Sequence, residues 1–356
     1  MRKERLITYA ESLKLDNSIY IDARTNAESE EATIPGAVNI ELLNYEERKV
    51  IGTIYKQQNP SKAKLKGVEL VSPKIPDLIA EIDELAKEYD NLIIFCSRGG
   101  LRSKSLAEFS DLAGIEVYRL ENGYKGYRHY IIDKLENYKF KGEIAVLHGN
   151  TGVGKTYILK EMEKMGAAII DLEGIANHRG SAFGSIGLEE PYNQKYFESL
   201  LWEELKLKDK EDRVIFVEAE SRRVGHSVIP EFFHQKMKAG ADLLITASMQ
   251  KRVENIYLEY IKDIESNQQE FIERVLESLT AIKKYLIKKA GKDSYFKLLE
   301  LAKKAEFKEL TKILLEEYYD PMYEHSQKKV DNYKAEIKAE NIEKAAQKII
   351  EIYKIN

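Results

Sequence analysis

The sequence predicts an α/β protein with two parallel-sheet domains and an α-helical C-terminal part, and three observations lead to this expectation. Short apolar segments of strand length alternate with helical periodicity over about the first 135 residues. A second series of apolar segments begins at residue 144 and continues to 246. From about residue 250 onward the chain is rich in Glu, Lys, Leu, Ile and Tyr at helical spacing. We therefore expect domains at 1–137 and 138–250, followed by a helical region at 251–356.

Each expected domain contains strands separated by helical stretches. The strands expected in the first domain lie at 18–21, 37–40, 92–96 and 116–119. The strands expected in the second domain lie at 144–148, 167–171, 213–218 and 242–246. In the first domain a helix is expected at 76–88, and the polar segment 44–74 is longer than an ordinary connector. A charged stretch at 133–143 marks the expected boundary between the domains.

Composition narrows the functional class. The 56 basic and 60 acidic side chains give a net charge of −4, so any contact with RNA must come from a local patch. The single cysteine, Cys96, excludes an internal disulfide and a cysteine-rich metal site. The first ten residues lack the apolar core of a signal peptide, and no apolar stretch reaches membrane-spanning length. We therefore expect a cytoplasmic protein without a membrane partner.

Cys96 lies where an apolar strand ends and a helix is expected to start. It is followed by Gly99 and Gly100, which allow a tight turn, and by Arg98 and Arg102, which add fixed positive charge. Backbone N–H groups and the positive end of a helix dipole at such a place favour the thiolate. A buried structural cysteine is the alternative interpretation, because that is the usual role of an isolated cysteine. The glycine turn and the flanking arginines favour a catalytic nucleophile.

A phosphate-binding pattern, G-x-x-x-x-G-K-[ST], follows the first strand of the second domain and precedes a helix. Its residues are Gly149, Asn150, Thr151, Gly152, Val153, Gly154, Lys155 and Thr156. The glycines let successive N–H groups point at phosphate oxygens, which Lys155 neutralises, and the Thr156 hydroxyl is suited to a Mg²⁺ ion. The pattern predicts a diphosphate or triphosphate ligand without specifying ATP.

Further groups for anion or metal support are expected at the ends of neighbouring strands. Asp171 follows one strand and Glu218 or Glu220 follows another. A helix cap or a surface charge is an equally open interpretation for each of these acids. Arg179 and Arg222 follow strands on the same expected face and are candidates for clamping anionic groups, although surface arginines are common.

The spacing of the cysteine loop, C-x5-R, leaves several enzyme classes open. Sulfurtransferases of the rhodanese type mostly have C-x4-R, whereas protein tyrosine phosphatases and rhodanese-folded cell-cycle phosphatases have C-x5-R. The runs Asp22-Ala23-Arg24 and Ile34-Pro35-Gly36-Ala37-Val38-Asn39-Ile40 resemble rhodanese signatures. Phe95 stands where tyrosine phosphatases carry a histidine. We therefore expect a rhodanese-like N-terminal domain whose longer loop accepts a phosphate-bearing chalcogen donor.

A rhodanese-like domain followed by a P-loop domain resembles the tRNA 2-selenouridine synthase family, and the resemblance runs nearly from end to end. The strings that carry it are Glu47-Arg48, Gly52-Thr53-x-Tyr55-Lys56-Gln57-Gln58, Cys96-x-Arg98-Gly99-Gly100-x-Arg102-Ser103, Glu121-x-Gly123-Tyr124-Lys125, Asp171-Leu172-Glu173-Gly174, His178-Arg179-Gly180-Ser181-Ala182-Phe183-Gly184, Glu220-Ser221-Arg222 and Glu317-Tyr318-Tyr319-Asp320-Pro321-Met322-Tyr323. Val153 departs from some relatives, which carry a cysteine there, and this change should not affect phosphate binding.

The resemblance implies a two-step modification of tRNA. The family attaches a geranyl group from geranyl diphosphate to the sulfur of wobble 2-thiouridine, and it replaces that sulfur by selenium at C2. The P-loop would then hold the diphosphate, with Lys155 stabilising the departing pyrophosphate. Cys96 would take selenium from selenophosphate as an S-selanyl intermediate, with Arg98 and Arg102 holding the phosphate. Candidates for an apolar trough, with core packing as the commoner role, are Phe183, Tyr192 and Tyr196.

Contact with tRNA is expected at two basic patches, although without the resemblance a solvated charged face would be the preferred interpretation of both. In the first patch Tyr55 is placed to stack on a base, and the basic residues are Arg48, Lys49, Lys56, Lys62, Lys64 and Lys66. The second patch consists of Lys283, Lys284, Lys288 and Lys289. A selenophosphate-supplying enzyme is a further expected partner. The alternative function is a P-loop kinase or NTPase with a fused sulfurtransferase domain, and the intact Cys96 and Lys155 disfavour a non-catalytic RNA-binding protein.

Overall fold

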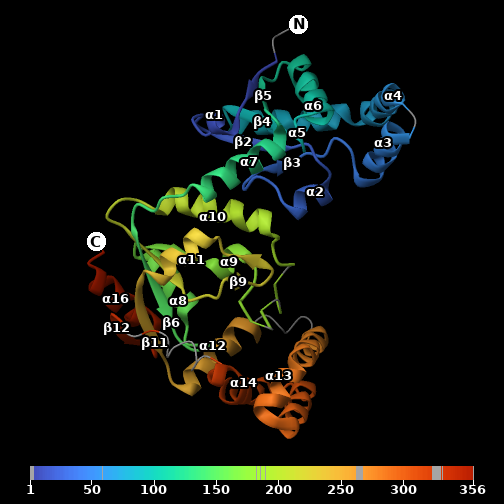
Figure 1. Cartoon of the computed structure of the whole chain (residues 1–356). Helices are drawn as coiled ribbons and strands as arrows, with labels where there is room; N and C mark the ends of the chain where they lie inside the picture. The colour runs from blue at the N-terminus through green and yellow to red at the C-terminus, as the bar shows by residue number, and fades with distance from the viewer. Residues whose placement is uncertain are drawn as a thin grey trace. The chain divides into compact units, whose positions relative to one another are not determined.

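The computed structural model (Figure 1) describes residues 4–57, 59–181, 183–184, 186–188, 190–261, 268–322, 330 and 332–355. Gln58, Ala182 and Tyr323, which belong to the family-like strings, lie outside these residues. The chain divides into two compact units, one of Met1–Asn137 with Lys195–Trp202 and one of Tyr138–Gln194 with Glu203–Asn356. Within the described ranges, no helix combines the length and the apolar character that a membrane span requires.

The first unit contains a parallel five-stranded sheet in the order β1-β5-β4-β2-β3. The strands are β1 (Leu6–Ile7), β2 (Ser18–Asp22), β3 (Val38–Asn39), β4 (Asn91–Phe95) and β5 (Val117–Leu120). The helices are α1 (Tyr9–Ser12), α2 (Asn26–Glu31), α3 (Tyr45–Gln57), α4 (Pro60–Val71), α5 (Ile75–Glu88), α6 (Leu101–Leu112) and α7 (Gly123–Glu136). Four consecutive side chains of β4, Leu92 to Phe95, are buried, as expected for a central parallel strand covered by helices on both faces. The predicted α/β fold is confirmed for this unit.

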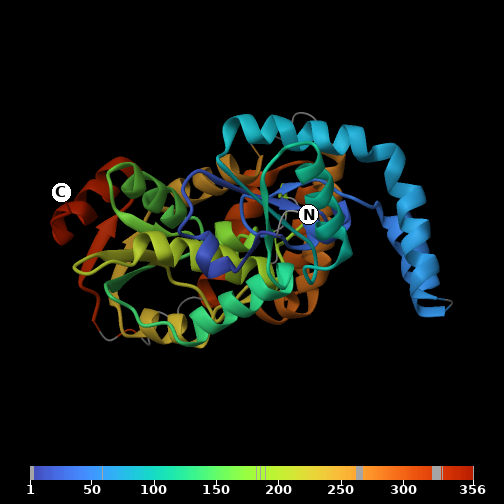
Figure 2. The ribbon, with the colours of Figure 1, turned by 90° about the horizontal axis from the view of Figure 1, so that it is seen from above.

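The polar segment at 44–74 is helical. Its two helices, α3 and α4, pack against each other, and a 3₁₀ turn at Ser72–Lys74 leads into α5. The Asn59 side chain accepts a hydrogen bond from the Ser61 N–H, and Pro60 occupies the first position of α4, where its missing N–H costs nothing. Figure 2 shows this helical pair, in blue, at one end of the unit. We call Tyr45–Val71 the α3–α4 hairpin.

The second unit contains a parallel five-stranded sheet in the order β12-β11-β6-β8-β7 and a two-stranded antiparallel pair. The strands of the larger sheet are β6 (Glu143–His148), β7 (Ala168–Ile170), β8 (Val214–Glu218), β11 (Ala241–Thr246) and β12 (Ala335–Lys338), and the smaller pair is β9 (Arg223–Val224) and β10 (Ser227–Val228). The helices are α8 (Lys155–Lys164), α9 (Leu172–Ala176), α10 (Gln194–Lys208), α11 (Glu231–Lys238), α12 (Met249–Ile261), α13 (Gln268–Lys303), α14 (Phe307–Leu314) and α16 (Ile342–Tyr353). Residues Lys195–Trp202 of α10 cluster with the first unit.

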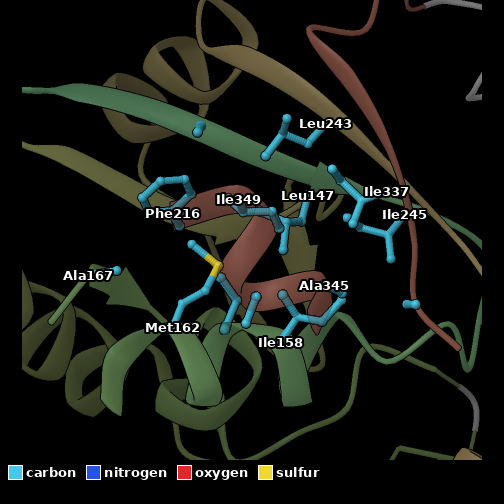
Figure 3. Packing of buried hydrophobic residues seen from close by; sticks show 14 of the residues in the cluster. Leu147, Ile158, Met162, Ala167, Phe216, Leu243, Ile245, Ile337, Ala345 and Ile349 are labelled. Carbon is cyan, nitrogen blue, oxygen red and sulfur yellow. The ribbon is translucent and has the colours of Figure 1, made fainter. Parts of the chain in front are cut away.

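A shared apolar core joins the larger sheet to α8 and α16 (Figure 3). Leu147 and Phe216 contribute from β6 and β8, Ile158 and Met162 from α8, and Ile349 from α16, and each is fully buried. Burying side chains of this size is worth about 1.5–3 kcal/mol each, so this core holds β6 and α8 firmly on either side of the loop between them.

The region 251–356 contains the expected helices and also completes the sheet. Helices α13 and α14 and a π-helical turn at Leu315–Tyr319 form their own apolar cluster. The chain then returns to the sheet, where β12 pairs with β11 and α16 covers the core. The expectation for this region included helices alone. Strand β12 was not predicted because it has only four residues, of which Ile337 alone is buried, so its sequence gives a weak strand pattern.

Candidate functional site

The P-loop connects β6 to α8 and adopts a glycine-dependent conformation. Gly149 has a φ of +152°, and an added Cβ would lie 2.5 Å from the carbonyl oxygen of Ile245. Gly154 caps α8 with a φ of +92°, and an added Cβ would lie 2.7 Å from Ile342 Cδ1. The loop therefore presents N–H groups at a helix N-terminus, which is a site for anions. Lys155 begins the helix, and its Nζ donates a 3.3 Å hydrogen bond to the Gly149 carbonyl.

Side chains from α12 fix the carbonyl groups of the P-loop. Arg252 donates from Nε to the Thr151 carbonyl at 2.9 Å, and Asn255 donates from Nδ2 to the Gly152 carbonyl at 2.9 Å. The two terminal nitrogens of Arg252 donate to both carboxylate oxygens of Asp320, at 2.8 and 2.6 Å. Asp320 Oδ1 also accepts a hydrogen bond from Asn150 Nδ2 at 3.1 Å. Val153 is buried in the core beneath the loop.

Three carboxylates converge beside the P-loop: Glu173 from α9, Glu218 from the end of β8, and Glu220. We call them the carboxylate cluster, because one oxygen from each lies within 4.8 Å of the others. Burial raises the pKa of all three carboxyl groups, and the charge of Lys155 lowers it. The charge of Glu218 further raises the pKa of Glu173 and of Glu220. Glu218 is 3% exposed, and its Oε1 has no hydrogen-bond partner among the described residues.

A cavity of about 660 Å³, which we call the phosphate cavity after the predicted ligand of the P-loop, joins the P-loop to this cluster. It is lined by Lys155, Thr156 and the carboxylate cluster, together with Arg179. Oxygen ligands and an orphaned buried carboxylate oxygen suit a hard divalent cation such as Mg²⁺. The residues present therefore fit a Mg²⁺ ion at this place, with the Thr156 hydroxyl as a further oxygen donor.

The other acid and the arginines predicted for this site are placed differently. Arg179 lines the cavity, where it pairs with Glu259 at 2.9 Å and lies 4.6 Å from the centre of the Tyr260 ring. Asp171 caps α9 by accepting a 2.7 Å hydrogen bond from the Gly174 N–H. Arg222 is largely exposed and does not line the cavity. Sequence reasoning missed Glu173 as a site residue, although its position two residues after Asp171, beyond a strand end, was a usable signal.

A second, apolar cavity of about 590 Å³ lies next to the phosphate cavity. The two share Thr151, Ser181, Ile256 and Tyr260 as lining residues. The walls of the apolar cavity come from α12, α13, α14 and the π-helical turn, and Phe183 also lines it. Tyr192 and Tyr196 are not among its lining residues. The cavity beside the P-loop therefore adjoins this apolar cavity, which we call the apolar chamber.

The cysteine site lies in the first unit, at the carboxyl end of β4. Cys96 is 3% exposed, and its Sγ lies 3.2 Å from Ser103 Oγ. Gly100 is the N-cap residue of α6, so the loop ends at a helix N-terminus, and Gly99 has a φ of +62°. Arg98 is exposed. Cys96, by contrast, is almost completely covered by its neighbours.

Arg102 is held by a carboxylate. Its Nη1 donates to Glu28 at 2.6 Å, and its Nη2 donates to Ser97 Oγ at 2.7 Å. Arg48 of α3 also pairs with Glu28, at 3.1 Å. Although burial opposes ionisation, the hydrogen bond and charge of Arg102 and the Ser97 hydroxyl lower the pKa of Glu28 to about 2. An anionic substrate at this loop must therefore compete with Glu28 for Arg102.

The residues predicted to contact tRNA lie on three helices, and Lys62, Lys64 and Lys66 of the first patch are on α4. Tyr55 and Lys56 are exposed on α3, where Arg48 also lies. Lys283, Lys284, Lys288 and Lys289 are exposed on α13. Each set therefore faces solvent, which leaves both open to a polyanion.

Two family models match the chain. A rhodanese-like domain matches residues 7–130, and the AAA domain of tRNA 2-selenouridine synthase matches residues 142–352. A tRNA 2-selenouridine synthase of Pseudomonas syringae pv. syringae is 33% identical over 335 residues, covering 88% of this chain and 89% of the relative. A tRNA 2-selenouridine synthase of Shewanella halifaxensis is 31% identical over 353 residues, covering 93% of this chain and 94% of the relative. With a matching model over more than half of its length and relatives aligned nearly end to end, the chain belongs to the tRNA 2-selenouridine synthase family.

Proposed function

We propose that this chain modifies wobble 2-thiouridine of tRNA in two steps: it alkylates the sulfur with the geranyl group of geranyl diphosphate, and it then replaces the sulfur by selenium from selenophosphate. The relatives' name, tRNA 2-selenouridine synthase, supports tRNA as the substrate and selenium as the incoming atom. The observation that carries the first step is the apolar chamber that opens from the phosphate cavity. A prenyl diphosphate has an anionic head and an apolar tail, which match these two cavities in that order.

In the first step the thiouridine sulfur attacks C1 of the geranyl group. The C1–O bond breaks, pyrophosphate leaves, and the nucleoside releases its N3 proton. Lys155 and the P-loop N–H groups stabilise the negative charge that develops on the leaving oxygen. A Mg²⁺ ion, when held by the carboxylate cluster and Thr156, would neutralise further diphosphate charge. The apolar chamber shields the tail from water.

In the second step selenium enters at C2, geranylthiol leaves, and water takes the phosphoryl group as phosphate. This exchange is redox-neutral. An S-selanyl cysteine would hold selenium in a more oxidised state than selenophosphate does. We therefore assign Cys96 a bond to carbon: its thiolate displaces geranylthiol from C2, and the selenium of selenophosphate then displaces Cys96. Arg98 is exposed beside the loop and is the cation available to the incoming phosphate group.

Nucleoside mass spectrometry tests both steps. A tRNA containing 2-thiouridine is incubated with geranyl diphosphate, Mg²⁺ and selenophosphate, and wild type should yield 2-selenouridine. Cys96→Ser should stop at the S-geranyl nucleoside, and Lys155→Ala should leave 2-thiouridine unchanged. Arg222→Ala, which removes a cation outside the phosphate cavity, is the matched control and should behave as wild type. No change of nucleoside mass in any sample, with Lys155-dependent ATP hydrolysis, would instead support the kinase or NTPase alternative.

A further inference from the structure

A separate apolar pocket lies in the first unit, beside the start of α6. Its volume, about 900 Å³ with the space open to solvent included, exceeds that of the apolar cavity in the second unit. Tyr55 and Val68 of the α3–α4 hairpin and Leu101, Arg102 and Phe109 of α6 are among its lining residues. We call it the hairpin pocket. Figure 1 shows α3 and α4 side by side in the first unit.

The hairpin pocket is continuous with the packing around the cysteine. Leu42, Leu43 and Val71 line the pocket and belong to the same buried cluster as Cys96. Leu101 and Arg102 line it from the first turn of α6, directly after the loop that begins at Cys96. A ligand in the pocket would therefore end beside the cysteine loop.

The rim of the hairpin pocket exposes apolar side chains to solvent. Tyr55 is 56% exposed, Val68 66% and Leu101 56%. Exposed apolar groups gathered around a pocket mark a binding surface, whereas single exposed ones are common. The cationic side chains that line the pocket are Arg102, which is already paired with Glu28, and Lys64, and neither belongs to a glycine-rich phosphate-binding loop. These walls suit a hydrocarbon chain without a diphosphate.

The charge around the hairpin pocket complements RNA. The α3–α4 hairpin carries six basic and three acidic side chains, in a chain whose net charge is −4. Lys64 is both a lining residue of the pocket and a member of this basic set. An RNA that carries a hydrocarbon chain therefore finds basic side chains for its phosphates and apolar walls for the chain at this pocket.

We propose that the hairpin pocket holds the prenyl chain of the S-geranylated wobble nucleoside and thereby presents C2 of that nucleoside to Cys96. This inference rests on the proposed function. The first step consumes the diphosphate, so the intermediate that must reach Cys96 is an RNA carrying a bare prenyl chain. The second unit offers a chamber for the chain with its diphosphate, and the first unit offers one for the chain without it. The hairpin pocket thus selects alkylated over unalkylated tRNA for selenation.

The test starts from RNA stem-loops that already carry S-geranyl or S-methyl 2-thiouridine, which bypass the P-loop. Steady-state conversion to 2-selenouridine with selenophosphate is measured for wild type, Val68→Glu and Leu65→Glu. Leu65 lies on the same helix, is 71% exposed and does not line the pocket, so its substitution matches the charge change. Because both positions are exposed, both variants should fold, and thermal unfolding checks this.

We expect wild type to prefer the S-geranyl substrate. Val68→Glu should raise the KM for S-geranyl RNA about tenfold, which is equivalent to about 1.4 kcal/mol. For S-methyl RNA, the KM of Val68→Glu should equal the KM of Leu65→Glu. Equal KM values for the two substrates in wild type, or equal effects of the two substitutions, would overturn the inference. No selenation of either substrate by wild type would instead refute the second step of the proposed function.

Discussion

Replacing Asp320 by alanine should loosen the P-loop, because this carboxylate pairs with a nearly buried arginine. The Arg252 side chain is 5% exposed, and it donates to both oxygens of Asp320 and to the Thr151 carbonyl. Removing the carboxylate leaves the guanidinium charge buried without its partner, which costs about 3–5 kcal/mol for a buried pair. Asp320 itself is 22% exposed, so water offsets part of this cost and the lower end, about 3 kcal/mol, applies.

The assay is thermal unfolding with and without geranyl diphosphate. A loss of about 3 kcal/mol should lower Tm by roughly 6–12 °C in a unit of this size. The affinity for geranyl diphosphate should fall as well, because Asp320 also holds the side chain of Asn150. Glu231→Ala, which removes the exposed pair with Arg222, should change stability by less than about 0.5 kcal/mol. If Asp320→Ala matched this control in both Tm and affinity, the pair would not support the P-loop.

Three further predictions address the two sites. The pKa of Glu28 in the folded protein, about 2, lies below its usual value of 4.5. The ionised carboxylate therefore adds stability above pH 4.5, and this stability is lost as the pH falls toward 2. Glu28→Gln should reduce the dependence of the free energy of unfolding on pH, measured by urea unfolding between about pH 6 and pH 3. Gly149→Ala should abolish diphosphate binding, measured by calorimetry, because its Cβ would meet a backbone carbonyl, whereas Gly52→Ala, with open space around it, should bind normally. Glu218→Gln should weaken the Mg²⁺ dependence of geranyl diphosphate binding, and an unchanged Mg²⁺ titration would argue against the carboxylate cluster as a cation site.

Local patterns predicted much of the fold and both loops. The run at 92–96 and the glycine pattern at 149–156 lie within a few residues of their own structural context, so their positions after β4 and β6 follow from sequence alone. The α3–α4 hairpin was less visible, because α3 buries none of its residues and its polar composition resembles that of a loop.

Long-range pairings could not be read from the sequence. Glu173 and Glu218 meet because β7 pairs with β8, and nothing local specifies that register. Arg252 and Asp320 come from helices far apart in the chain, and each is a common charged residue whose partner is fixed only by tertiary packing. Burial, rather than residue type, distinguishes Glu218 from the many acids on the surface.

The return of the chain to the second sheet has a consequence for biosynthesis. All strands of the first sheet have left the ribosome once residue 120 has emerged, so that sheet can form early. The second sheet must wait for β12, and its core must wait for Ile349 of α16, roughly two hundred residues after the P-loop. Pairing of β11 with β12, which lie about ninety residues apart in the chain, is non-local and therefore slow. The apolar face of the nascent sheet stays uncovered until that pairing forms. The unit that carries the P-loop is therefore the part expected to depend on chaperones during translation.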